Sequence, residues 1–372
     1  MLDSIKHIID VLSSPTISFT LLTVGFPFIF PPTDYFDRIN RRLGIYKIWT
    51  NTGGIIGMVL ITIFFVMGYL DKNFQVILLK PDNFPIVLMV YSMFFFLWLA
   101  MKKAYINDER IESGKKPSEY HDPEDKVLVW PDLVYIELIA LILFMVFLIV
   151  WSILSAAPLE EPANPAATPN PSKAPWYFLG LQEMLVYFDP WIAGILFPMF
   201  IIIGTSAIPY MDINKKGDGY YSFKERRVGI FIFMYGWIIL WVYLIIIGTF
   251  FRGPNWNFFG PFEYWDPHKV VSLVNINLSE YFWVIGLDKP LPTNIIVRES
   301  LGIIVVLFYL FVLPLILAKT WLKDMYNSYG PVRYSFLMMF GLSMLSLPIK
   351  MYLRWIFNLK YLVAIPEWFF NI

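Results

Sequence analysis

The chain contains no cysteine, has only three histidines among 372 residues, and carries few charges. Without cysteine it cannot hold an iron–sulfur cluster by thiolates, a covalently attached haem or a disulfide. Charged residues make up 16% of the sequence and apolar residues 58%, far from the composition of an average soluble protein. The formal net charge of zero gives no general attraction to nucleic acid. We therefore expect an integral membrane protein, because lipid is the solvent that accepts this much apolar surface.

Seven apolar segments are long enough to cross the hydrocarbon core, which takes roughly 20 helical residues. Backbone polar groups in lipid must be satisfied internally, so helices are expected. An apolar stretch from Ser14 to Phe30 also contains prolines, which favour an interfacial or re-entrant element over a short eighth span. The predicted fold is an all-α integral membrane protein with spans at about 53–70, 84–101, 131–155, 190–209, 227–251, 295–318 and 333–349.

The distribution of lysine and arginine predicts which loops face the cytoplasm. Alternate connections carry 18 cationic residues on one side and 9 on the other. The richer side consists of residues 34–50, 102–127, 211–227 and 319–333. The opposite side, predicted to be the outer face, includes a proline-rich loop at 156–189 and a long loop at 252–294.

The three histidines bear on haem binding. A haem held by two imidazoles between membrane helices needs paired histidines inside two spans. His7, His121 and His268 all lie outside the predicted spans. We therefore expect no b-type haem in this chain, and no other metal site is predicted.

Two carboxylates are candidates for chemistry, since a carboxylate in or near the bilayer is costly. Glu137 lies inside the third span, where a helix-packing hydrogen bond and a proton route are equally open. Glu183 follows an aromatic turn on a short apolar stretch, and no capping role explains it. A carboxylate in such a setting is expected to accept a proton near neutral pH.

The two outer loops differ in their expected roles. Prolines and aromatic residues stiffen the 156–189 loop, which suits a pocket for a flat ring. The segment 250–268 is a compact aromatic lid punctuated by prolines. We expect this lid to pack against the outer domain of a partner protein, with direct ligand contact as the alternative.

Several motifs resemble the C-terminal half of cytochrome b, which is a separate chain, subunit IV, in the cytochrome b6f complex. They are Trp130–Tyr135, the Glu161–Pro169 loop and the pair Trp176–Tyr177. The later stretches Gly253–Pro261 and Leu353–Lys360 look like the extended form found in bacterial menaquinol–cytochrome c reductases. On this resemblance, 129–372 is a cytochrome b C-terminal-like domain with five spans. Residues 1–128 are an N-terminal extension with two spans and a cytoplasmic connector.

The resemblance implies a (mena)quinol:cytochrome c oxidoreductase in a bacterial cytoplasmic membrane. In that family, outer-face quinol passes electrons to a Rieske 2Fe-2S protein and to b haems on a cytochrome b6-like chain. A c-type cytochrome accepts electrons, and the complex is a dimer of several subunits. The family's loop glutamate is replaced by Pro175, so Glu183 is the expected proton acceptor. Tyr177 would hydrogen-bond the quinol, while Pro175, Trp176 and Phe178 form the pocket.

Two other functions compete with this interpretation. A transporter or channel subunit predicts several polar residues along a path, whereas Glu137 is almost alone at mid-span. A catalytically silent membrane anchor of an electron-transfer complex keeps the family fold without the pocket. The proline at position 175 leaves this second alternative open.

Overall fold

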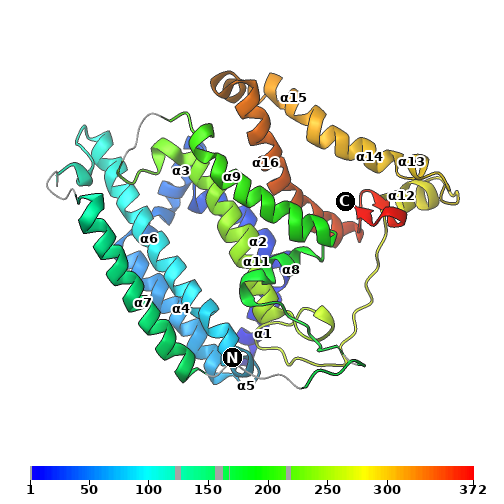
Figure 1. Ribbon diagram of the computed structural model, residues 1–372, viewed down its shortest axis with the longest axis horizontal. Coiled ribbons are helices and arrows are strands. Elements are labelled where there is room, and N and C mark those ends of the chain that lie inside the picture. The colour runs from blue at the N-terminus through cyan, green and yellow to red at the C-terminus, as the bar shows by residue number, and fades with distance from the viewer. Residues whose placement is uncertain (1, 122–126, 156–161, 167, 215–218) are drawn as a thin grey trace. The chain divides into compact units, whose positions relative to one another are not determined.

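The computed structural model of the protein describes residues 2–121, 127–155, 162–166, 168–214 and 219–372, and it is predominantly helical (Figure 1). Parts of two predicted features lie outside these ranges: residues 122–126 of the connector, and Glu161 and Ala167 of the proline-rich loop. Seven helices in the described ranges are long and apolar enough to cross a membrane. They span Asn51–Leu70, Pro81–Glu112, Val129–Leu154, Ile192–Met211, Lys224–Phe251, Ser300–Lys319 and Lys323–Phe357. The all-α membrane fold and the seven predicted spans are therefore confirmed.

The chain divides into two compact units that interleave along the sequence. Unit 1 consists of Met1–Trp176, Lys216–Tyr235 and Thr249–Pro267, and unit 2 of Tyr177–Lys215, Gly236–Gly248 and His268–Ile372. The fifth span contributes residues to both. The predicted division at residue 128 separates an extension from a cytochrome b-like region by sequence, and it stays a prediction.

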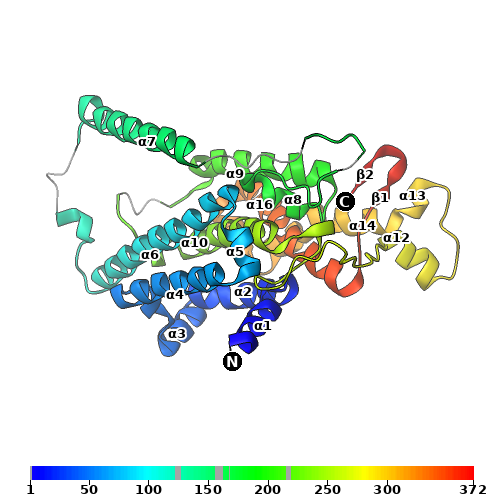
Figure 2. The same ribbon diagram turned by 90° about the horizontal axis from the view of Figure 1, so that it is seen from below.

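Unit 1 begins with two short helices that meet at a sharp bend. The α1 and α2 axes differ by 74° at a break where Pro15 starts α2, which fits either a broken span or a re-entrant element (Figure 2). The helices of unit 1 are α1 Leu2–Ser13, α2 Pro15–Ile29, α3 Asp34–Leu43, α4 Asn51–Leu70, α5 Lys72–Leu78, α6 Phe84–Glu112, α7 Val134–Leu154 and α10 Arg227–Met234.

Glycines set the close approach of α4 and α6, which lie side by side in unit 1 (Figure 1). A Cβ on Gly54 would come within 2.4 Å of the Trp98 indole. A Cβ on Gly57 would come within 2.0 Å of the Phe94 ring. Small residues of this kind let membrane helices pack without a hydrophobic driving force.

Near the C-terminal end of α6, a buried carboxylate ties the helix to the segment where the fifth span begins. Asp108 accepts hydrogen bonds from the Ser222 hydroxyl at 2.6 Å and from the backbone N–H groups of Phe223 and Lys224 at 3.1 and 3.0 Å. These bonds satisfy the carboxylate, and they anchor a loop that the charge distribution predicts to face the cytoplasm.

Unit 2 contains the remaining spans and a small antiparallel sheet in which Ala364 pairs with Asn371. Glu299 is buried next to the sheet and accepts a hydrogen bond from the Ala364 N–H at 2.9 Å. The elements of this unit are α8 Leu179–Met184, α9 Phe197–Met211, α11 Tyr243–Ile246, α12 Leu278–Glu280, α13 Ile295–Arg298, α14 Ser300–Leu307, α15 Leu313–Lys319, α16 Lys323–Phe357, β1 Ala364–Ile365 and β2 Phe370–Asn371.

Candidate functional site

The loop 252–267, which we call the outer loop after its predicted side, is folded against helices α1 and α5 of its own unit. The backbone N–H of Phe262 donates to an Asp10 carboxylate oxygen at 2.8 Å. The Asn73 side-chain amide donates to the Phe262 carbonyl at 3.0 Å. A Cβ on Gly260 would come within 2.4 Å of Asp10, so glycine is needed for this approach. The aromatic lid therefore has packing partners within the chain, and contact with a partner's outer domain stays a prediction.

An ion pair also fixes α1 to the corner between α4 and α5. The Lys6 ammonium lies 2.6 Å from an Asp71 carboxylate oxygen. Asp71 also caps α5 by accepting from the backbone N–H groups of Asn73 and Phe74 at 2.9 and 3.1 Å. Burial opposes ionisation of Asp71, but the bond from Lys6 and the capping bonds lower its pKa below the ordinary value. The N-terminal helix is thus part of the support of the outer loop.

The described part of the proline-rich loop is fastened to this same outer loop. Asn170 and Asn255 exchange two hydrogen bonds, one between side-chain amides at 2.8 Å and one from the Asn255 N–H to the Asn170 side-chain oxygen at 2.6 Å. The Lys173 ammonium donates to the Thr249 carbonyl at 2.8 Å and lies 4.7 Å from the centroid of a Trp265 ring. These contacts support the stiffness expected of the loop.

The loop ends in a single 3₁₀ turn, Trp176–Phe178, which leads directly into α8. Trp176 closes unit 1 and is half-buried, and Pro175 before it is exposed. In unit 2, Tyr177 and Phe178 are each 49% exposed, and their ring centroids are 4.7 Å apart. The turn therefore presents a pair of aromatic rings at the surface of unit 2.

Glu183 lies on the buried face of α8 and is 1% exposed. Leu179 and Gly180 share that face, which packs against α11, where a Cβ on Gly180 would come within 3.3 Å of Ile245. The burial expected for Glu183 is present. However, Tyr177 is exposed while Glu183 is buried, so the two predicted catalytic residues face different surroundings.

Glu137 lies apart from these residues on α7. It is exposed, and no residue of α7 within Val134–Leu154 is buried in this chain. A carboxylate on a lipid-depth helix surface is costly, so Glu137 is expected to face protein or water in the assembled state. The choice between a packing hydrogen bond and a proton route stays open.

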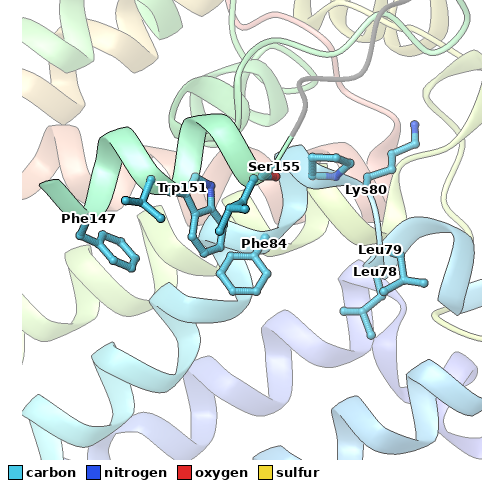
Figure 3. A pocket seen from close by; sticks show the side chains of 10 residues that line it. Leu78, Leu79, Lys80, Phe84, Phe147, Trp151 and Ser155 are labelled. Atoms are coloured by element: carbon cyan, nitrogen blue, oxygen red, sulfur yellow. The ribbon is translucent and has the colours of Figure 1, made fainter. Parts of the chain in front are cut away.

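A cavity of about 400 Å³ lies between the α5–α6 connection and the last turns of α7 (Figure 3). The Trp151 and Phe84 rings both line it and are in contact with each other, with centroids 4.3 Å apart and ring planes tilted by 45°. Its wall is apolar apart from Lys80 and Ser155, and it contains none of the predicted quinol-pocket residues. The sequence analysis did not predict this cavity. Its signal is the spacing of Phe147 and Trp151, which are four residues apart and therefore lie on one helix face.

Metal ligands do not cluster in the described part of the chain, where no three histidine, aspartate or glutamate side chains come together. His7, His121 and His268 all fall outside the seven candidate spans.

Comparison with known proteins identifies the region that contains the loop and the turn. Residues 162–261 match the family described as cytochrome b (C-terminal)/b6/petD. A Bacillus subtilis (strain 168) protein named menaquinol:cytochrome c reductase cytochrome c subunit is 31% identical over 111 residues, which cover 28% of this chain and 40% of the relative. The chain thus spans less than half the length of that relative. No solved structure matches the chain. Residues 162–261 are therefore similar to the C-terminal part of cytochrome b, as the resemblance of the proline-rich loop predicted.

Proposed function

We propose that this chain is the quinol-site subunit of a cytochrome bc-type menaquinol:cytochrome c oxidoreductase. The observation that supports the proposal most is the family match over residues 162–261, because it includes most of the proline-rich loop, the aromatic turn and the first part of the outer loop. The activity would belong to the assembled complex, since a chain without cysteine and with its histidines outside the seven candidate spans needs electron carriers from partner chains. The proline-rich loop would lie on the outer side of a bacterial cytoplasmic membrane, as the lysine and arginine bias favours.

In this proposal the exposed turn binds the head of the quinol. Tyr177 holds one quinol hydroxyl by a hydrogen bond, and Trp176 and Phe178 supply ring surfaces. Pro175 has no side-chain proton acceptor, so another group must take the proton. Glu183 is the nearest carboxylate along the chain and is buried at 1% exposure, which makes it the candidate acceptor. Proton transfer then requires the quinol hydroxyl to reach the buried face of α8.

The electron carriers would reside on partner chains. Two spans with facing histidines are needed for a b haem, and the histidines of this chain lie outside its candidate spans. A cytochrome b6-like subunit would supply b haems, a Rieske protein its 2Fe-2S cluster, and a c-type cytochrome the acceptor, in a dimeric complex embedded in lipid. The Bacillus subtilis relative is named a cytochrome c subunit, but a chain without cysteine attaches no c-type haem.

Turnover of the purified complex with Tyr177→Phe and Glu183→Gln variants tests the proposal. Loss of a general base typically costs a factor of about 100 or more, so Glu183→Gln should lower quinol oxidation by that order. Tyr177→Phe removes one hydrogen bond of about 1.4 kcal/mol, so it should weaken competition by a quinol analogue roughly tenfold. The matched controls are Tyr210→Phe and Glu109→Gln, which change exposed side chains and should leave turnover intact.

The alternative is a catalytically silent anchor, and the observation that favours it is Pro175 at the place of the family's loop glutamate. Unchanged turnover and unchanged inhibitor competition in both variants would establish the anchor and reject the quinol site.

A further inference from the structure

Three cationic side chains gather where α16 ends in unit 2. Lys350 and Arg354 are one turn apart on the helix and are only 2% and 8% exposed. Lys360 follows shortly after the helix and is partly buried. The Lys350 ammonium donates to the Lys360 carbonyl at 2.7 Å, which joins the two segments. We call Lys350, Arg354 and Lys360 the cationic cluster.

The side-chain hydrogen bonds that this cluster forms with the described residues all end on backbone carbonyls. Arg354 donates from one terminal nitrogen to Val274 at 2.9 Å and to Asn358 at 3.1 Å. Lys360 donates to Val186 at 3.4 Å. The Tyr361 ring lies near two of the charges: its centroid is 5.7 Å from the Lys350 ammonium and 5.2 Å from the Lys360 ammonium. Carbonyls and ring faces solvate the charges without neutralising them.

No carboxylate in the described part of the chain forms an ion pair with the cationic cluster. Asp189 is the carboxylate that interacts electrostatically with Lys360 without forming an ion pair. Its oxygens are engaged by the Asn371 side-chain amide at 2.9 Å and the Trp191 N–H at 3.3 Å. Even when Asp189 is counted, three cations face one anion. Burial and the charge of Arg354 lower the pKa of Lys360.

Such an arrangement needs a counter-ion. Buried charges in proteins are normally paired, and like charges four residues apart on a helix repel each other. The second terminal nitrogen of Arg354 has no hydrogen-bond partner among the described residues. Arg354 keeps some exposure and Lys360 keeps more, so an anion can reach both side chains.

We propose that the phosphate of an anionic lipid headgroup binds the cationic cluster and neutralises it. The cluster lies at the end of the candidate span Lys323–Phe357, which is the depth of the headgroups. Exposed apolar side chains flank the cluster on the same helix, namely Ile349, Ile356 and Phe357 at 44, 64 and 52% exposure. A lipid satisfies both parts of this surface, because its phosphate meets the cations and its acyl chains cover the apolar residues. Free phosphate satisfies only the first part.

The test begins with the unaltered complex, purified and stripped of lipid. Its thermal unfolding is followed after reconstitution into vesicles of pure phosphatidylcholine and into vesicles that also contain phosphatidylglycerol. Inorganic phosphate is added to the phosphatidylcholine sample at the same total phosphate concentration. We expect phosphatidylglycerol to raise the unfolding temperature and inorganic phosphate to leave it unchanged. Equal stability in the two vesicle types, or an equal gain with inorganic phosphate, overturns the proposal.

Variants assign the effect to the cluster. Native mass spectrometry of the complex should show that Arg354→Gln and Lys360→Gln each weaken phosphatidylglycerol binding at least tenfold. Lys289→Gln is the matched control, because Lys289 is an exposed cation of the same unit and its side chain forms no hydrogen bond with the residues that the structure describes. Undiminished binding in both cluster variants, or the same loss in the control, contradicts the assignment.

Discussion

Replacement of Lys173 by methionine tests whether the proline-rich loop is held by its contacts with the outer loop. Methionine keeps most of the volume of the side chain but cannot donate to the Thr249 carbonyl, which lies 2.8 Å from the ammonium. A hydrogen bond from a charged donor contributes about 1.5–3 kcal/mol when buried, and less at a partly exposed site. The contact with the Trp265 ring at 4.7 Å adds about 0.5–1 kcal/mol.

We therefore expect Lys173→Met to cost about 2 kcal/mol of loop docking, which corresponds to roughly a 30-fold larger open population. Hydrogen exchange of the amides between residues 168 and 178, measured in the assembled complex by mass spectrometry, reports this population directly. Exchange should accelerate by a similar factor in the variant, while Lys289→Met should leave it unchanged. If Lys173→Met exchanged at the rate of the unaltered protein, the loop would be held by something other than these two contacts.

Two further predictions concern the packing of unit 1 and the C-terminal sheet of unit 2. Gly54→Ala would put a methyl group within 2.4 Å of Trp98, so it should lower stability by about 1–3 kcal/mol in thermal unfolding. Gly229→Ala meets nothing within 4 Å, so it should be nearly neutral. The hydrogen bond from Arg298 lowers the pKa of Glu367 to about 2, so the pair stabilises the fold fully above the ordinary value of 4.5 and loses its effect as the pH falls towards 2. Exchange protection of residues 364–371 should fall over that interval, whereas Arg298→Gln should start with lower protection and show little further pH dependence.

The membrane fold could be predicted from the sequence because span length is a local property. An apolar run of sufficient length must become a helix in lipid whatever surrounds it. All seven spans predicted this way are present, with ends that differ by a few residues and, at α6 and α16, by more. Helix α16 is kinked at Gly330, which has a φ of 75° and precedes Pro331, so the predicted start at residue 333 lies just after this kink. The helix then continues past Pro348.

The supports of the outer loop could not be predicted in the same way. Asp10 and Asn73 hold Phe262 although the sequence separates them by 252 and 189 residues. Neither residue belongs to a motif, and hydrogen-bonding side chains of this kind are common in any surface segment. Only the approach of α1 and α5 to the loop distinguishes these two from other polar residues.

Part of the candidate site could be predicted from the sequence, and part depends on the tertiary structure. The order of residues in the proline-rich loop was enough to predict the similarity to the cytochrome b C-terminal family, since that order is a property of the chain itself. The opposite surroundings of Tyr177 and Glu183 depend on which face of α8 packs against α11, and periodicity over a six-residue helix was too short to indicate it. In the same way the composition gave three cations near the C-terminus, but their burial without a carboxylate partner was decided by tertiary structure. Burial and pairing of charges depend on segments far apart in the chain, whereas the capacity to cross a bilayer depends on consecutive residues.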